Sequence, residues 1–401
     1  MARKERYLVG LDVGTSKVTA VVGEMLDGNG LDIVGIGVAE SRGIRRGVVV
    51  NLEAAVDSIK KAIEEAELMA GVEIDSVHLA LSGPHVRGFN SRGVIAVAGK
   101  NREITREDVR RAIDAAKAVS LPTGREILHV LPQDFVVDDH PGHRDPRKML
   151  GSVLEANAHV IMVSTMEHNA SVGAINQAHL SVDETVFEAF AACYAAGLPE
   201  NRPEGIALLD IGAQSSELVV YFGNALQLAS TIGLSGDHFT SDLAHFLRIS
   251  FADAAEVKEQ FGSVIPESTT ETSVIELAAR EGQAQRDASR WKINEVLQSR
   301  AHHLFALVER ELARVGMEQA LTGGLILTGG GSLLHGLVEM AEQELKCPAW
   351  RGLPRGIVGW PEDLNDPAWT TAAGLAKYSA RLRTQVDLER QSIGLLGRIL
   401  Q

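Results

Sequence analysis

Cysteine, aromatic residues and long apolar runs are all scarce in this sequence. Its 401 residues include two cysteines, Cys193 and Cys347, which are too few for a disulfide framework or a cysteine-based zinc site and favour a reducing cytoplasm. Phe, Trp and Tyr make up 4% of the chain, which leaves little surface for stacking single-stranded nucleic acid. No apolar run reaches the roughly 18 residues that a membrane span needs, so we expect any membrane contact to be peripheral.

Basic residues are also fewer than acidic ones. The 39 Lys and Arg face 53 Asp and Glu, a net charge of −14, so the chain lacks the basic footprint of a dedicated nucleic-acid binder. Its 45% hydrophobic and 23% charged residues are typical of a globular protein and exclude disorder, collagen and coiled coil. The length predicts about two to four domains, and we expect partners that are proteins or small molecules.

The first 83 residues have the pattern of an α/β unit. An amphipathic helix is expected after Asn51, its N-cap, and should stop at Gly71. Alternating and β-branched residues predict strands at Tyr7–Asp12, Val18–Gly23, Asp32–Val38 and His78–Ser82.

The pattern changes between Pro84 and about Val160. Two strand-like stretches flank a helix that starts at Thr105, whose hydroxyl can cap the amides near Asp108. The α/β pattern then resumes at Val160. We therefore expect an inserted subdomain.

A second α/β pass begins at Gly205, after a linker bracketed by Pro199 and Pro203. The rest of the chain is expected to contain, in order, a mostly helical block from Gly236 to about Val315 that includes a long helix over Asp287–Arg314, an α/β unit over Leu325–Ala380, and a polar spacer over Thr384–Gln391.

One repeat is the most informative feature. The segments Asp12-Val13-Gly14-Thr15-Ser16-Lys17 and Asp210-Ile211-Gly212-Ala213-Gln214-Ser215-Ser216 each place Asp at the end of an apolar strand, followed by Gly, hydroxyl residues and another strand. Backbone N–H groups of such hairpins converge and can bind phosphate oxygens. Two hairpins facing each other could hold a triphosphate, with Asp12 and Asp210 binding Mg²⁺ through its waters. An Asp-x-Gly hairpin on its own is more often an ordinary turn.

A third glycine-rich element follows the strand Leu325–Thr328. Gly329, Gly330 and Gly331 are consecutive and lead into a helix expected to start near Ser332. Such a turn serves either helix packing or close approach to a ligand. Because two Asp-Gly hairpins precede it, we expect this turn to approach an adenosine.

These three motifs, in this order, resemble the actin-like ATPase superfamily, and within it the FtsA family of bacterial cell-division proteins. The segments Ser82-Gly83-Pro84-His85-Val86, Ile104 to Val109 and His129-Val130-Leu131-Pro132-Gln133 are similar to that family's inserted subdomain, 1C. The resemblance implies an α/β, duplicated actin-like fold with a 1C insert of SHS2 type. Its subdomains would be 1A in residues 1–83, 161–198 and 365–383, 1C in 84–160, 2A in 199–233 and 318–364, 2B in 234–317, and a linker with an amphipathic membrane-targeting helix in 384–401.

The resemblance also implies ATP and Mg²⁺ as cofactors, with slow ATP turnover at best. Residues implied in nucleotide binding are Asp12, Gly14, Thr15, Ser16, Lys17, Asp210, Gly212, Ser215, Gly236, Glu256, Lys258, Gly329, Gly330, Gly331 and Ser332. Candidates for orienting the attacking water are Glu184, Glu188 and Gln214. The family's second phosphate loop usually continues with further glycines and threonine, whereas this chain has Ala213-Gln214-Ser215-Ser216-Glu217. A Cβ at Ala213 and the Gln214 side chain narrow the room for a γ-phosphate, so the sequence supports ATP binding more than ATP hydrolysis.

Two alternatives share the same core: the pilus-assembly relative PilM, and a metabolic kinase. The family reading implies self-assembly into filaments through 1C and the body, binding of the C-terminal peptide of the tubulin-like ring protein FtsZ through 2B, contact with other division proteins, and no nucleic-acid partner. It places the protein on the cytoplasmic face of the cell membrane at the division site.

The C-terminal segment carries the membrane prediction. Leu395, Leu396, Ile399 and Leu400 fall on one face at helical spacing, and Arg398 is available to anionic headgroups. The competing interpretation is a frayed end or a helix packed on the body.

Overall fold

Two five-stranded sheets of the same topology form the body of the molecule. The computed structural model describes residues 6–26, 30–99, 101–198, 204–277, 285–317 and 319–399, with side chains described as far as residue 386. The first sheet has the order β11 (Ser181–Phe187), β6 (Ser76–Leu81), β1 (Tyr7–Val13), β2 (Lys17–Met25), β3 (Leu31–Glu40). The second has the order β14 (Ala225–Ile232), β13 (Ser216–Phe222), β12 (Ile206–Ile211), β17 (Gly324–Thr328), β18 (Ala349–Arg351).

The pairing confirms the predicted duplication. In each sheet three consecutive strands form an antiparallel meander, and the first of them, β1 or β12, pairs in parallel with a strand that follows much later, β6 or β17. The two Asp-Gly hairpins are therefore equivalent turns of two equivalent sheets.

Helix α1 (Leu52–Ala70) covers β2 and β3 of the first sheet, as the amphipathic pattern predicted. The Asn51 side chain accepts from the amide of Ala54, and Gly71 ends the helix in the left-handed conformation. Close packing requires Gly37 on β3, because a Cβ there would overlap the carbonyl oxygen of Ala62.

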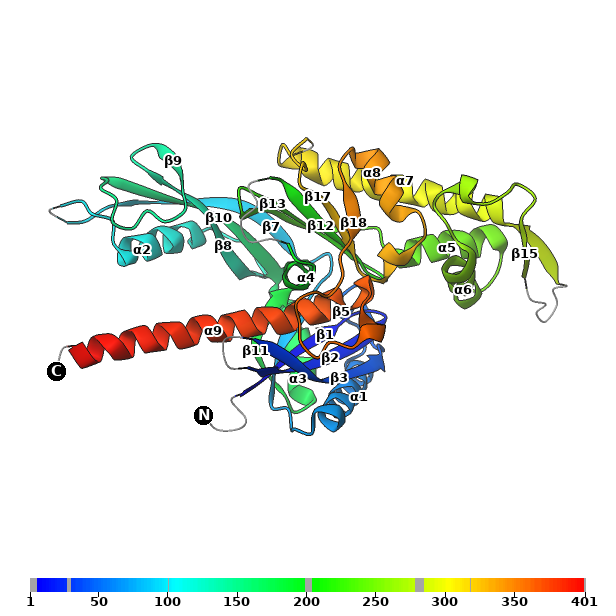
Figure 1. The fold of residues 1–401 in the computed structure, drawn as a ribbon, viewed down its shortest axis with the longest axis horizontal. Coiled ribbons are helices and arrows are strands. Elements are labelled where there is room, and N and C mark those ends of the chain that lie inside the picture. Colours follow the sequence, from blue (N-terminus) through cyan, green and yellow to red (C-terminus); the bar gives the residue numbers. More distant parts are fainter. Residues whose placement is uncertain are drawn as a thin grey trace.

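The insert is a separate four-stranded sheet, with the order β7 (Arg87–Ala96), β10 (Val153–Ser164), β8 (Arg125–Val137), β9 (His140–His143). Helix α2 (Arg106–Lys117) packs on one face, and Thr105 and Asp108 form the predicted capping box. The insert also rests on the second sheet, since Gln133 Nε2 donates to the carbonyl oxygen of Leu226 on β14 at 2.7 Å. In Figure 1 the insert and the helical block project from opposite ends of the body.

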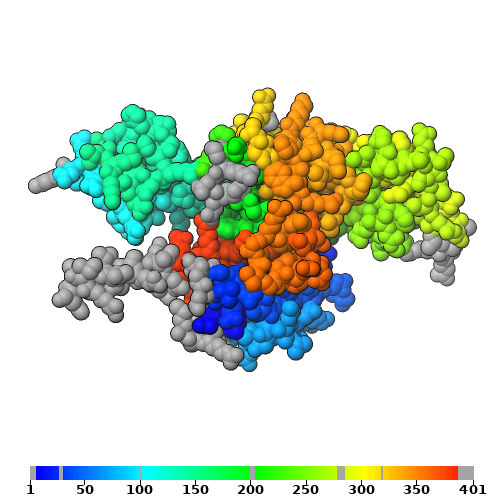
Figure 2. Space-filling model, in the orientation of Figure 1, coloured from blue at the N-terminus to red at the C-terminus, as the bar shows by residue number. Residues whose placement is uncertain are grey.

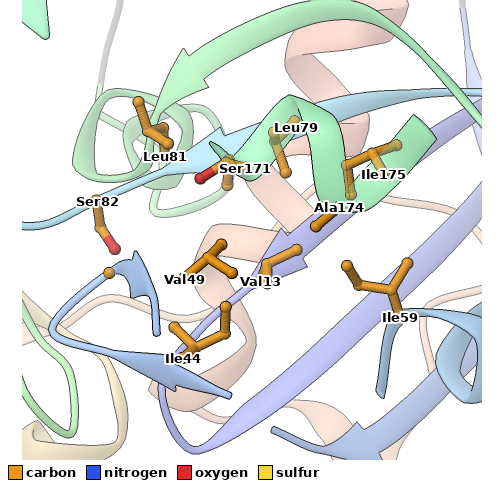
Figure 3. Close-up of a pocket in the computed structure, with 12 residues that line it drawn as sticks. Val13, Ile44, Val49, Ile59, Leu79, Leu81, Ser82, Ser171, Ala174 and Ile175 are labelled. Atoms are coloured by element: carbon orange, nitrogen blue, oxygen red, sulfur yellow. The ribbon is translucent and has the colours of Figure 1, made fainter. Parts of the chain in front are cut away.

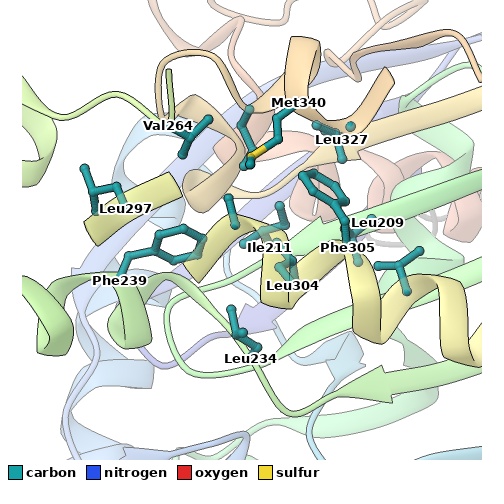
Figure 4. Close-up of a cluster of buried hydrophobic side chains, with 14 of the residues drawn as sticks. Leu209, Ile211, Leu234, Phe239, Val264, Leu297, Leu304, Phe305, Leu327 and Met340 are labelled. Carbon is teal, nitrogen blue, oxygen red and sulfur yellow. The ribbon is translucent and has the colours of Figure 1, made fainter. Parts of the chain in front are cut away.

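The helical block contains α5 (Gly236–Leu247), α6 (Phe251–Phe261) and α7 (Arg290–Arg314). The long helix begins three residues later than the predicted Asp287, because residues 286–289 form strand β16 and pair with β15 (Val274–Leu277). Ser289 then caps α7 by accepting from the amide of Lys292. A continuous apolar cluster joins this block to the second sheet, with Leu209 and Ile211 of β12 packed among helix side chains (Figure 4).

Among the described residues, the body also contains the α-helices α3 (Thr165–Gln177), α4 (Glu188–Ala195), α8 (Leu337–Leu345) and α9 (Thr370–Ile399). Helices α4 and α9 pack together, and Phe190, Tyr194 and Tyr378 meet there in edge-on ring contacts. The backbone of α9 runs unbroken from Thr370 to Ile399, so the expected polar spacer is helical. No helix in the described ranges has the length and apolar character to cross a membrane.

Candidate functional site

The first predicted phosphate loop joins β1 to β2. Asp12 is buried, and burial raises its pKa to about 7, while Lys17 opposes and Asp210 adds to the shift. The turn is tight, since a Cβ at Gly14 would lie 3.0 Å from the carbonyl oxygen of Lys17. The Lys17 ammonium lies 3.3 Å from the centre of the Trp369 ring, and burial lowers the Lys17 pKa.

The second loop, between β12 and β13, supports the start of α5. The amide of Gly212 donates to the carbonyl oxygen of Ser215 at 2.9 Å and closes the turn. The carbonyl oxygens of Gly212 and Ala213 accept from the amides of Gly236 and Asp237 at 2.9 and 2.8 Å. Gly236, predicted to bind nucleotide, therefore lies against this loop at the positive end of a helix.

Three carboxylates meet beside the second loop. Glu188, Asp210 and Glu217 each have an oxygen within 4.8 Å of the others. Asp210 Oδ2 accepts from the hydroxyls of Thr328 and Thr371 at 3.1 and 3.0 Å. Asp12 belongs to the facing loop and acts on this group through its charge.

Glu217 is the member that sequence reasoning missed. It is fully buried, and burial followed by the nearby Asp210 carboxylate raises its pKa to about 8. Its Oε1 accepts from the amide of Gly83 at 3.2 Å, whereas Oε2 is buried without a hydrogen-bond partner among the described residues. A charged residue at the second position of a strand whose five following residues are apolar or aromatic was the signal that could have found it.

This oxygen-rich group has the chemistry that a magnesium ion requires. Mg²⁺ takes oxygen ligands, usually one or two carboxylates together with waters and phosphates. Burial raises the pKa of Glu188 and of Asp210, and the neighbouring carboxylates of Glu217, Asp12 and Asp210 raise that of Glu188 further. The cluster therefore disfavours full ionisation unless a positive charge offsets it. The orphaned Glu217 oxygen fits such an ion.

The third loop does not lead directly into a helix at Ser332, contrary to expectation. Gly330–Leu333 is a 3₁₀ turn, and α8 begins at Leu337. The loop packs against β12: a Cβ at Gly329 (φ +77°) would overlap Asp210 Oδ1, and one at Gly331 would overlap the Ile211 side chain. Two of the three glycines thus serve packing. Gly330, whose Cβ would meet nothing closer than 3.8 Å, is the one with room beside it.

The three candidates for orienting water have different surroundings. Glu188 is half-buried within the carboxylate group. Glu184 accepts from the Tyr378 hydroxyl at 2.8 Å, between α9 and β11. Gln214 is held by two partners, the Arg46 amide at 3.1 Å and Asp237 Oδ2 at 2.9 Å.

The two candidates on α6 also differ from each other. Lys258 donates to the Thr240 hydroxyl at 2.8 Å, next to the first turn of α5, and burial lowers its pKa. Glu256 is exposed and accepts from Gln260 on the same helix at 2.9 Å. Lys258 therefore lies close to the second loop, while Glu256 faces solvent.

The residues predicted to contact the membrane lie beyond the part of the chain whose side chains the structure describes. The side chains of Leu395, Leu396, Arg398 and Ile399 lie outside the described side chains, and Leu400 lies outside the described residues altogether. The linker prolines at 199 and 203 also lie outside the described ranges.

Comparison with known proteins adds family relationships to this geometry. The family model for an SHS2 domain inserted in FtsA matches residues 83–162, and the model for cell division protein FtsA matches residues 207–374. Cell division protein FtsA of Borreliella burgdorferi is 39% identical, over 92% of this chain and 90% of the relative. The FtsA proteins of Pseudomonas aeruginosa (35%, over 97% and 91%) and Escherichia coli (31%, over 99% and 96%) match similarly.

Solved structures show the fold more broadly. A PilM–PilN type IV pilus biogenesis complex aligns with TM-score 0.67 at 19% identity, over 93% of this chain and 98% of that chain. MreB5 of Spiroplasma citri bound to AMPPNP aligns with TM-score 0.60 at 16% identity, over 96% and 99%. At these identities the likeness shows the fold alone, and it confirms the predicted actin-like architecture.

Proposed function

Because the chain belongs to the FtsA family of cell division proteins, we propose that it binds ATP with Mg²⁺ between its two halves and acts mainly as a nucleotide-dependent scaffold. The observation that supports this most is the convergence of the Asp12 loop, the Asp210 loop and the Gly330 turn around one group of carboxylates, of which Asp210 and Glu217 are buried. Family membership also favours division over the pilus-assembly and kinase alternatives.

We call the space between the hairpin loops of the two halves the cleft, and each group that lines it has a role in this proposal. Backbone N–H groups of the two hairpins would bind phosphate oxygens, with Lys17 as a charged donor. Asp12, Asp210 and the Glu217 and Glu188 carboxylates would face Mg²⁺, which supplies charge to offset the phosphates. Turnover should be slow, because all three candidate residues for orienting water are engaged: Glu184 and Gln214 by hydrogen bonds, and Glu188 within the carboxylate group.

The nucleotide assignment is tested at Gly330. A side chain has room there, so Gly330→Asp should fold and should place a negative charge beside the expected adenosine and phosphates. We expect calorimetry to show a loss of ATP affinity for Gly330→Asp and little change for Gly330→Ala. Equal affinity of the two variants would show that the turn does not adjoin the nucleotide.

Filament formation is proposed through the insert and the body. The insert lies at one end of the molecule (Figure 2) and exposes apolar side chains, including Leu150 at 70% and Val94 at 52%. Head-to-tail contacts between such ends produce open filaments. Deleting residues 84–160 should abolish filaments in electron micrographs, and Leu150→Asp should weaken them without altering ATP binding. Filaments that persist in the deletion would refute this role.

Binding of the FtsZ C-terminal peptide is proposed on subdomain 2B. Phe246 of α5 and Phe251 of α6 are exposed there, at 44% and 47%, and could receive the apolar part of an acidic peptide. Arg300 is less available, because it forms a two-pronged ion pair with Asp242 at 2.6 and 2.7 Å. Phe246→Ser with Phe251→Ser should reduce peptide binding in a polarisation assay. Unchanged binding would show that the peptide does not bind at Phe246 and Phe251.

Membrane attachment is proposed for the end of α9. Truncation before Gln385, or Leu396→Asp with Ile399→Asp, should release the protein from anionic vesicles in sedimentation while ATP binding stays the same. A single short helix binds weakly, so filaments would strengthen attachment through avidity. Continued sedimentation of either variant with vesicles would exclude this anchor. Together these activities would tether the FtsZ ring, with other division proteins, to the cytoplasmic face of the membrane at the division site.

A further inference from the structure

A short hairpin of the first half reaches across to the second. It consists of β4 (Ile44–Arg45) and β5 (Val48–Val49), joined by a two-residue turn in which Arg46 and Gly47 both have positive φ (51° and 71°). Its base is fixed to the first half, since Ile44 and Val49 line a cavity of about 20 Å³ together with Val13 at the end of β1 (Figure 3). That cavity has room for about one water, so the base is closely packed.

The tip of the hairpin is also held. A Cβ at Gly47 would overlap the carbonyl oxygen of Ser82, so the tip lies directly against the turn after β6. The amide of Arg46, at the outer end of the tip, donates across the cleft to Gln214 Oε1 at 3.1 Å. The Arg46 charge also helps to lower the pKa of His238 on α5, after burial and Arg300.

Gln214 connects this tip to α5. While its oxygen accepts from Arg46, its Nε2 donates to Asp237 Oδ2 at 2.9 Å. The two partners fix the orientation of the amide, because a flipped amide would oppose donor to donor at Arg46 and oxygen to oxygen at Asp237. Glycine or threonine at position 214 would supply no amide able to accept and donate at once.

Asp237 is a firm anchor for this connection. It lies in the first turn of α5, where a carboxylate is favoured by the helix dipole, and its own amide donates to the Ala213 carbonyl oxygen at 2.8 Å. One side chain on the second phosphate loop thus links a hairpin of the first half to a helix of the second.

We propose that Gln214 is a latch that holds the two halves together across the cleft and slows the release of nucleotide. This inference rests on the proposed binding of ATP. A nucleotide held between the two hairpins leaves when the halves separate, and separation breaks the bond between Gln214 and Arg46. Because both ends of the amide are engaged, Gln214 acts as a positioning residue and does not orient the attacking water.

Release of a fluorescent ATP analogue from the full-length protein tests the latch. Gln214→Ala should accelerate dissociation roughly five- to tenfold, the effect of losing the one neutral hydrogen bond between Arg46 and Gln214 that joins the two halves. Gln214→Glu should also accelerate it, because a second carboxylate would face Asp237. Asp237→Ala should reproduce the effect, and Asp237→Asn should restore most of the wild-type rate, because its amide oxygen can still accept from Gln214. Gln177→Ala, at an exposed glutamine of α3, is the matched control.

Hydrogen exchange without nucleotide separates this inference from the proposed function. Amides of residues 44–49 should exchange faster in Gln214→Ala than in the wild type or in Gln177→Ala. If the wild-type protein failed to bind ATP, the proposed function would fail, and the exchange experiment would still decide whether the latch exists. Unchanged exchange and unchanged release in Gln214→Ala would overturn the latch. Slower hydrolysis with unchanged release would overturn it as well, in favour of a water-orienting role.

Discussion

Replacing Glu217 by glutamine should remove much of the pH dependence of folding stability. Burial and the Asp210 carboxylate raise the pKa of Glu217 from 4.5 to about 8. The folded protein therefore binds more protons than the unfolded chain between these two values. The contribution of Glu217 to the unfolding free energy is fully present below about pH 4.5 and is lost as the pH rises towards 8.

The size of the effect follows from the shift. At 1.36 kcal/mol for each pKa unit, the rise from 4.5 to about 8 corresponds to a loss of about 5 kcal/mol of unfolding free energy. This is an upper limit for the difference between the wild type and Glu217→Gln, because Asp12, Glu188 and Asp210 titrate with Glu217 and share the cost. The glutamine oxygen can still accept from the Gly83 amide, so the variant keeps that hydrogen bond.

Urea denaturation between pH 5 and 8.5, in chelator and without nucleotide, measures the effect. Glu217→Gln should become more stable relative to the wild type as the pH rises, whereas Glu256→Gln, at an exposed position on α6, should follow the wild-type curve. Adding Mg²⁺ at pH 8 should recover stability in the wild type more than in Glu217→Gln. Parallel pH curves for the wild type and Glu217→Gln would refute the reasoning.

Two further predictions concern the loops around this group. Gly329→Ala should lower the unfolding free energy by about 2–4 kcal/mol, because it combines positive φ with a clash against Asp210, whereas Gly330→Ala should cost under about 1 kcal/mol; urea denaturation compares them. Lys17→Met should weaken ATP binding in calorimetry about tenfold, since it removes a charged donor from the first loop while keeping apolar contact with the Trp369 ring.

The fold followed from local patterns to a large extent. Asn51, Gly71 and the Thr105–Asp108 box set helix ends through contacts within a few residues, and these were predicted correctly. The duplication was visible because each Asp-Gly hairpin is a local turn between adjacent strands. The start of α7 was wrong, because pairing between residues 274–277 and 286–289 competes with helix formation and joins segments that no local pattern links.

The site was predictable only where its residues are close in sequence. The two hairpins could be recognised, but Thr371 reaches Asp210 across 161 positions and Gly83 reaches Glu217 across 134. The sequence also left the role of the glycines at 329–331 open between packing and ligand approach. The structure divides that role, since Gly329 and Gly331 pack on β12 and only Gly330 has space beside it.

Two carboxylates of the cleft, Asp210 and Glu217, also accept hydrogen bonds from the segments that lead into the C-terminal helix and into the insert. Asp210 accepts from Thr371, the second residue of α9, and that helix continues to the C-terminal segment. Glu217 accepts from Gly83, directly before the insert. An ionised carboxylate is a stronger acceptor than a protonated one, so gain or loss of a proton at either residue changes the strength of these hydrogen bonds. The charge state of the cleft is therefore coupled to the base of the insert and to the start of α9 through one hydrogen bond each.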